Sequence, residues 1–168
     1  MQKFKAILNR KGFTLIEVII ALALVGVGTV VAGMGIVWIS SGYNFTKENA
    51  ATALKGQVTL TRLVKEFSAI SAVNAASANS ITYVMYKDGA TVTSTVAWAG
   101  STGDPLLLNG DILTDDVTGF VLAYYDTYDG ASQSSWSSSR KLISVTLTLE
   151  GAENVASAFT IRVAPRNI

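Results

Sequence analysis

The sequence predicts an α+β fold in which a long N-terminal hydrophobic helix packs on an antiparallel β-sheet head. Three observations predict this fold. Residues 13–39 are apolar except for Glu17, residues 40–72 place apolar side chains at helical spacings, and the chain beyond Ser80 alternates strand and turn signals. We therefore expect a membrane-length helix over 13–39, an amphipathic continuation over 40–72 and a globular β-rich head over 73–168.

The apolar segment runs for 27 residues, from Phe13 to Ile39, and Glu17 is its single charged residue. At about 1.5 Å per residue, a helix of this length exceeds the ~30 Å hydrocarbon core of a bilayer. Four basic residues lie within the first eleven positions, and the next basic residue is Lys47. Because basic residues mark the cytoplasmic side, we expect a single-pass protein with a cytoplasmic N-terminus.

The length of the segment and the presence of Glu17 distinguish between a secretory signal peptide, a simple membrane anchor and a helix with a further function. An ordinary secretory signal peptide has an apolar region of only about 7–15 residues. A simple membrane anchor fits the length, but a carboxylate inside the bilayer costs on the order of 3 kcal/mol. No cation lies within the apolar run, so we expect the partner of Glu17 to be a lipid head group, Arg10 or Lys11, or another molecule.

The stretch Lys11-Gly12-Phe13-Thr14-Leu15-Ile16-Glu17-Val18, followed by a long apolar helix, resembles the N-terminal signature of type IV prepilins and type II secretion pseudopilins. The resemblance implies that residues 1–12 are a leader, that prepilin peptidase cuts between Gly12 and Phe13, and that the new amine of Phe13 is methylated. It implies as further partners other pilin-like subunits, an inner-membrane assembly platform and, before assembly, membrane lipid. The implied location is the bacterial inner membrane, with the head in the periplasm, and then a periplasmic or surface filament.

After such a cleavage, Phe13 would carry a cationic amine four residues before Glu17, on the same helix face. In a filament of packed helices, the Glu17 carboxylate of one subunit could pair with the Phe13 amine of its neighbour. A subunit out of axial register leaves both groups unpaired, so the pair would set register more than net stability. We therefore predict Glu17 as the assembly residue.

Two absences favour a minor rather than a major subunit within this family. Major pilins commonly carry a helix-kinking proline in the stalk, whereas the two prolines here are Pro105 and Pro165. Many also close a C-terminal loop with a disulfide, and this chain has no cysteine. The succession from Asp116 through Tyr125, a polar loop and two further strands is similar to J-type minor pseudopilins and W-type minor pilins. That similarity implies a position near the filament tip.

The elements of the head follow from local patterns. In the amphipathic helix we expect one face to be buried against the head: Ala50, Ala53, Leu60, Val64 and Phe67. Strands are predicted at 81–86 and 91–98, joined by a hairpin turn at Lys87-Asp88-Gly89. Further strands are predicted at 106–108, before Asn109-Gly110, and then at 117–125, 142–149 and 159–163.

The composition excludes several kinds of active site. The chain has no histidine and no cysteine, so it contains no thiol nucleophile, no histidine general base and no histidine metal ligand. Beyond residue 11 the chain has nine basic and twelve acidic residues without a basic patch, so nucleic acid is not an expected partner. We expect a structural subunit and not an enzyme.

Two carboxylate clusters lie in the head, Asp115-Asp116 and Asp126/Asp129. Both stand in turn-like contexts, so we expect solvated turn residues and not a catalytic pair, which needs two different environments. No cofactor is expected. Asp126 and Asp129 are the candidates for calcium, although their spacing lacks the ligand density of an EF-hand loop. Trp98 and Trp136 are candidates for the core or for a loop tip, and Trp136, which lies among six serines in 131–139, is the better candidate for a contact surface.

Two alternatives remain open from the sequence. The same kind of subunit could serve a type II secretion system, a type IV pilus or a competence system. Alternatively, the chain is a bitopic inner-membrane protein whose extracytoplasmic head binds a ligand, in which case it would keep its leader.

Overall fold

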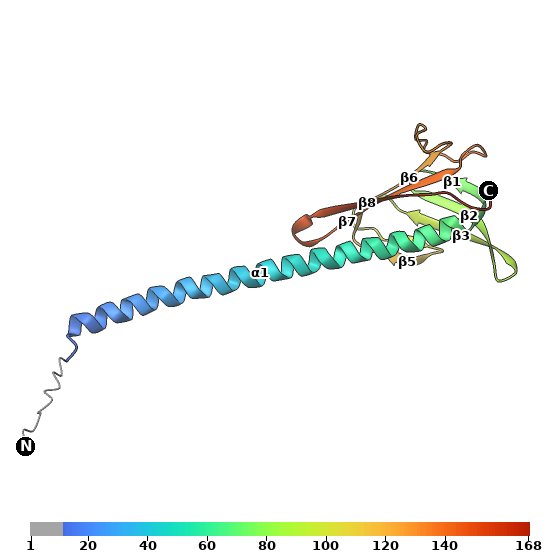
Figure 1. Cartoon of the computed structure of the whole chain (residues 1–168). Helices are drawn as coiled ribbons and strands as arrows, with labels where there is room; N and C mark the ends of the chain where they lie inside the picture. Colours follow the sequence, from blue (N-terminus) through green and yellow to red (C-terminus); the bar gives the residue numbers. More distant parts are fainter. Residues whose placement is uncertain (1–11) are drawn as a thin grey trace, which may run out of the picture. The chain divides into compact units, whose positions relative to one another are not determined.

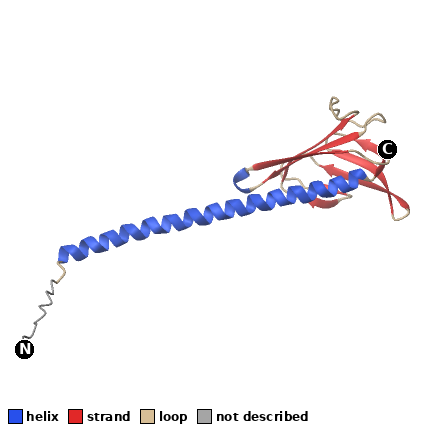
Figure 2. Cartoon of the chain, in the orientation of Figure 1, coloured by secondary structure: helices blue, strands red, loops and turns tan. Residues whose placement is uncertain are grey.

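The structure, a computed structural model, describes residues 12–168. One long helix, α1 (Leu15–Ser68), precedes all the strands (Figures 1 and 2). Contacts divide the chain into two units, Met1–Asn44 and Phe45–Ile168. Of the predicted leader, residues 1–11 lie outside the described residues. The order of elements, a helix followed by antiparallel strands, confirms the α+β fold.

In the first unit, α1 carries the predicted apolar segment and is helical from Leu15 onward. The apolar side chains of this segment are all exposed, including Leu15 and Trp38. By length and composition, α1 is the one helix among residues 12–168 that could span a membrane, and its most apolar stretch contains no buried residue. Because exposing this much apolar surface to water is unfavourable, the segment needs lipid or other helices around it.

The second unit contains two antiparallel sheets, where the sequence analysis expected one. The five-stranded sheet has the order β1-β2-β3-β4-β5 and consists of β1 (Ile70–Ala76), β2 (Ser80–Lys87), β3 (Ala90–Trp98), β4 (Leu106–Leu108) and β5 (Asp111–Thr114). The predicted hairpin between β2 and β3 is confirmed. Its two turn residues, Asp88 and Gly89, both have positive φ (52° and 82°), as a type I′ turn requires.

The three-stranded sheet has the order β6-β7-β8 and consists of β6 (Val117–Tyr125), β7 (Leu142–Glu150) and β8 (Ala156–Val163). Strand β6 has the predicted bounds, and β7 extends one residue beyond them. Strand β8 begins three residues earlier than predicted, after a short 3-10 turn at Ala152–Asn154. Strands β7 and β8 pair without a register shift from Ile143–Val163 to Glu150–Ala156.

The two sheets are joined where the turn after β1 meets β6. The Leu122 N–H donates to the Ala78 carbonyl at 2.6 Å, and the Tyr124 hydroxyl donates to the Ser77 carbonyl at 2.9 Å. Tyr124 is fully buried, and this burial raises the pKa of its hydroxyl above the usual range. The neutral hydroxyl therefore acts as a hydrogen-bond donor that ties one sheet to the other.

In the second unit, α1 contributes one face to the core of the head. The buried helix residues are Gly56, Thr59, Leu60, Leu63 and Phe67. Of the face predicted from the sequence, Leu60 and Phe67 are buried, Ala53 and Val64 are half-buried, and Ala50 is exposed. The true face is therefore rotated from the predicted one, and the prediction for Ala50 was wrong.

Gly56 marks the closest approach between α1 and β8. A Cβ atom at this position would collide with three ring atoms of Phe159. Phe159 in turn packs against the buried core. A glycine here lets the helix backbone lie directly on an aromatic ring, which explains why Gly56 is part of the buried face although it has no side chain.

Helix α1 ends at Ser68 and not near residue 72, because the chain enters the sheet at Ile70. Ile70 is fully buried and pairs with Met85 of β2. Strand β1 was not predicted, since two register shifts break its ladder and its exposed residues do not alternate regularly. The short strand β5 was also missed.

Candidate functional site at the start of the helix

Helix α1 begins with a capping box formed by Thr14 and Glu17. The Thr14 N–H donates to Glu17 Oε2 at 3.4 Å, and the Glu17 N–H donates to Thr14 Oγ1 at 3.3 Å. This reciprocal arrangement satisfies two backbone donors that the first turn of a helix leaves without partners. The negative charge of Glu17 also lies at the positive end of the helix dipole.

The capping box gives Glu17 a partner that the sequence analysis did not consider. No cation lies within the apolar run, but the backbone N–H of Thr14 supplies a donor to the Glu17 carboxylate instead. The sequence does contain the pattern of a capping box, which is Thr followed three residues later by Glu, directly before an apolar run. Thr14 is therefore a residue of this site that sequence reasoning missed.

Gly12 and Phe13 lie immediately before the helix, outside any regular element. Both are exposed, and nothing lies within 4 Å of the position that a Cβ atom on Gly12 would occupy. The peptide bond between them is thus free of secondary structure and accessible. Phe13 and Thr14 directly precede Leu15, the first residue of α1, and Glu17 lies in the first turn of the helix.

Comparison with known families bears on these same residues. Residues 7–33 match the prokaryotic N-terminal methylation motif. This match supports a type IV prepilin or pseudopilin. No curated protein and no solved structure matches the chain. Because the matched residues end within α1, they bear on Gly12, Phe13 and Glu17 but not on the J-type or W-type subfamily.

The methylation motif implies processing by prepilin peptidase and assembly with other pilin subunits, and it suggests a structural protein. The exposed apolar part of α1 and the motif together fit a membrane-anchored pilin.

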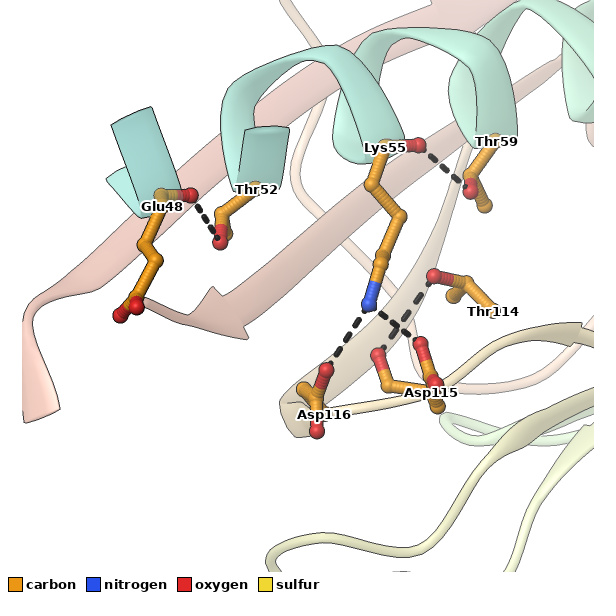
Figure 3. A network of polar contacts seen from close by, with 7 residues as sticks. All are labelled: Glu48, Thr52, Lys55, Thr59, Thr114, Asp115 and Asp116. Atoms are coloured by element: carbon orange, nitrogen blue, oxygen red, sulfur yellow. Dashed lines mark hydrogen bonds and ion pairs between the residues drawn. The ribbon is translucent and has the colours of Figure 1, made fainter. Parts of the chain in front are cut away.

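In the head, Asp115 and Asp116 are not simple solvated turn residues. Figure 3 shows the Lys55 side chain of α1 reaching both carboxylates, with Nζ 2.5 Å from Asp115 Oδ1 and 2.8 Å from Asp116 Oδ2. The hydrogen bond from Lys55 lowers the pKa of Asp115, and the pair raises the pKa of Lys55. One cation therefore satisfies both carboxylates, which makes this cluster a structural contact between α1 and the loop before β6.

Asp126 has protein partners of its own, Arg140 and Ser139. Asp126 Oδ1 lies 2.5 Å from Arg140 Nη1 and accepts a hydrogen bond from Ser139 Oγ at 3.1 Å. The Arg140 contact lowers the pKa of Asp126. Asp129 is exposed. Within residues 12–168, no three acidic side chains lie close enough to hold a metal ion.

The two head tryptophans are structural. The Trp136 ring lies 5.7 Å from the Tyr124 ring, edge to face, and packs against the buried core. Trp98 Nε1 donates to the Asp104 carbonyl at 3.2 Å. Trp136 is half-buried against Tyr124, and the serines around it face solvent, so its role in a contact surface stays a prediction.

Proposed function

We propose that this chain is a minor structural subunit of a type II secretion pseudopilus or a type IV pilus. The observation that carries the proposal is the methylation motif at residues 7–33, whose Gly12 and Phe13 form an accessible peptide bond directly before a capped, exposed apolar helix. In this proposal, prepilin peptidase removes residues 1–12 and methylates the amine of Phe13.

Assembly then proceeds through α1. Before assembly, Thr14 holds the Glu17 carboxylate in the capping box, which compensates part of the cost of placing that charge near lipid. In the filament, the carboxylate pairs with the Phe13 amine of a neighbouring subunit. The carboxylate has two oxygens, and the Thr14 contact uses only Oε2, so capping and pairing are compatible.

The subunit is stored in the bacterial inner membrane as a single-pass protein, with its N-terminus in the cytoplasm and its head in the periplasm. It then enters a periplasmic or surface filament. The absence of a stalk proline and of cysteine supports the minor role, and the similarity to J-type and W-type minor subunits supports a position near the filament tip. Partners are other pilin-like subunits, prepilin peptidase and the inner-membrane platform.

The proposed role requires no catalytic residues and no cofactor. Calcium binding at Asp126 and Asp129 is not part of the proposal, because calcium would have to displace Arg140 from Asp126. The genes beside this one would distinguish a type II secretion system from a type IV pilus or a competence system.

Intact-mass measurement of the membrane-bound protein tests the proposal. We expect a mass that lacks residues 1–12 and includes one added methyl group. Gly12→Leu should leave a heavier, uncleaved chain because prepilin peptidase would have to accept a bulky side chain next to the bond that it cuts. The chain itself should fold unchanged, since nothing lies within 4 Å of a Cβ atom at this position. An unprocessed N-terminus in the native chain would exclude the pilin role and favour a bitopic protein with a ligand-binding head.

A further inference from the structure

We propose that the head forms a two-fold dimer through the outer edge of β8, with β8 of one copy pairing antiparallel with β8 of a second copy. The inference concerns the head alone and does not rest on the proposed processing or assembly. It follows from a free sheet edge, from the side chains along that edge and from the charges at its two ends.

Strand β8 is the longest regular free edge in the described part of the head. It is the last strand of its sheet, and its ladder with β7 has no register shift. The other sheet margins are less suited to pairing: β1 contains two register shifts, and β5 has only four residues. On β6, backbone groups bond to Gly103, Ala78 and Gln133. An unpaired, regular edge is a template for another strand.

Hydrogen bonds on β6 identify which groups of β8 point outward. Tyr124 bonds through both N–H and C=O to Gln133, on the side away from β7. In an antiparallel ladder, inward and outward bonding alternate along each strand. Tyr124 therefore does not bond to Ile143, its partner on β7. The N–H and C=O of Ile143 point toward β8 instead and bond to Val163, which is its partner there. The outward N–H and C=O groups of β8 therefore belong to Ala156, Ala158, Thr160 and Arg162.

The side chains of these four residues leave the edge accessible. All four are exposed, and the first three are small. Arg162 is the one charged residue of β8, and a charged side chain usually protects a strand edge from pairing. Here its guanidinium is held elsewhere: it lies 4.4 Å from the ring centroid of Tyr125 on β6 and donates to the Tyr128 carbonyl. It therefore reaches back across the sheet and away from the free edge.

The charges at the two ends of β8 identify a second copy as the occupant. Glu153 precedes the strand and Arg166 follows it, and both are exposed. Among the described residues, neither takes part in an ion pair. An antiparallel second copy brings Arg166 of each chain close to Glu153 of the other, which gives two equivalent charge contacts. This reciprocity is what a two-fold interface requires.

One register uses all four outward residues. It pairs Ala156 with Arg162 and Ala158 with Thr160 of the second copy, and it places Phe159 opposite Phe159. The long Arg162 then faces the small Ala156 on the exposed side, the two small residues Ala158 and Thr160 face each other, and no two arginines are opposed. Pro165 lies two residues beyond Val163 and has no N–H with which to continue the ladder with β7, so β8 ends here.

Thiol crosslinking of the full-length chain in detergent tests this register, since the native sequence has no cysteine. We expect an equimolar mixture of Ala158→Cys and Thr160→Cys chains to form several-fold more crosslinked dimer than either variant alone, using a short thiol-to-thiol reagent. Val121→Cys is the matched control, because Val121 is exposed, lies in the same cross-strand row and belongs to β6. Crosslinking of the mixture at the level of Val121→Cys would overturn the proposal.

Charge reversal provides a second, independent test. Glu153→Arg and Arg166→Glu should each lower the crosslinking of the mixture several-fold, and the two changes together in every chain should restore it. Restoration distinguishes a lost interface from a misfolded head. Failure of the combined variant to restore crosslinking, or crosslinking of Thr160→Cys to a different polypeptide in native membranes, would contradict pairing with a second copy.

Discussion

The Nζ atom of Lys55 lies 2.5 Å from Oδ1 of Asp115 and 2.8 Å from Oδ2 of Asp116, so one cation on α1 holds two consecutive carboxylates of the head. The loop that it holds is constrained further. Asp116 has a left-handed backbone conformation with φ of 56°, and its carbonyl accepts a hydrogen bond from the Glu150 N–H at 2.9 Å. Lys55 therefore connects α1 to the start of β6 and, through Asp116, to the end of β7.

Lys55→Met should lower the free energy of unfolding of the head by about 0.5–1 kcal/mol. The expected loss is small because the ion pairs are partly exposed and water screens them. Chemical denaturation of the full-length protein in detergent, followed by tryptophan fluorescence, measures the change. Lys47→Met is the control, since Lys47 is exposed and forms no ion pair among the described residues. An equal effect of both substitutions would contradict the assigned role of Lys55.

The stabilising effect of Lys55 should depend on pH at both extremes. The pKa of Asp115 is lowered by Lys55, so this carboxylate stabilises the fold above its unfolded pKa of about 3.9, and the contribution is lost as pH falls through the lowered value. The pKa of Lys55 is raised above 10.5, so its contribution is complete below 10.5 and is lost as pH rises through the raised value. The stability difference between native and Lys55→Met chains should thus be constant between about pH 5 and 10. A difference that changes within this range would require another titrating group.

Gly56→Ala should destabilise the head by about 1–3 kcal/mol, even though alanine favours helix by about 1 kcal/mol over glycine. The reason is that the added Cβ would meet the Phe159 ring. Combining Gly56→Ala with Phe159→Leu should cost less than the sum of the two single changes, because the smaller side chain removes the collision. Strictly additive costs, measured by denaturant unfolding, would show that the two residues do not press on each other.

Glu17→Gln should separate the two roles of this carboxylate. Glutamine can also complete a capping box, so α1 should still begin at the same place and the protein should still be inserted and processed. It cannot pair with a cationic amine, so the variant should fail to enter filaments, as Glu17→Ala should. Filament incorporation is measured in sheared fractions and processing by intact mass. Normal incorporation of Glu17→Gln would show that capping alone accounts for Glu17.

Thr14→Val is the complementary variant, since it removes the hydroxyl acceptor but leaves the charge of Glu17 in place. If charge pairing governs assembly, this variant should enter filaments at a level much closer to native than Glu17→Gln does. Comparable loss in both variants would instead show that the capping box as a whole is required.

Local patterns were sufficient wherever one short stretch of chain decides its own structure. The apolar run with Glu17 predicted the long helix, Asp88-Gly89 predicted the hairpin, and strict alternation predicted β7, because each signal depends on neighbours in sequence. The Thr14–Glu17 capping box could likewise have been predicted, because its two residues are three positions apart in the sequence. Strand β1 could not be predicted from the sequence, because its own residue pattern is irregular. Its pairing with β2 holds it in the sheet.

The sequence by itself therefore determined the long apolar helix, the place of Gly12 and Phe13 before it and the antiparallel character of the head. Only the tertiary structure decided which helix face is buried, that Gly56 meets Phe159 and that Lys55 pairs with Asp115 and Asp116. It also decided that Trp136 covers Tyr124 and that Arg162 turns away from the edge of β8. The physical reason is that these contacts join residues far apart in the chain, whose meeting depends on how the helix and the two sheets pack and not on any local periodicity.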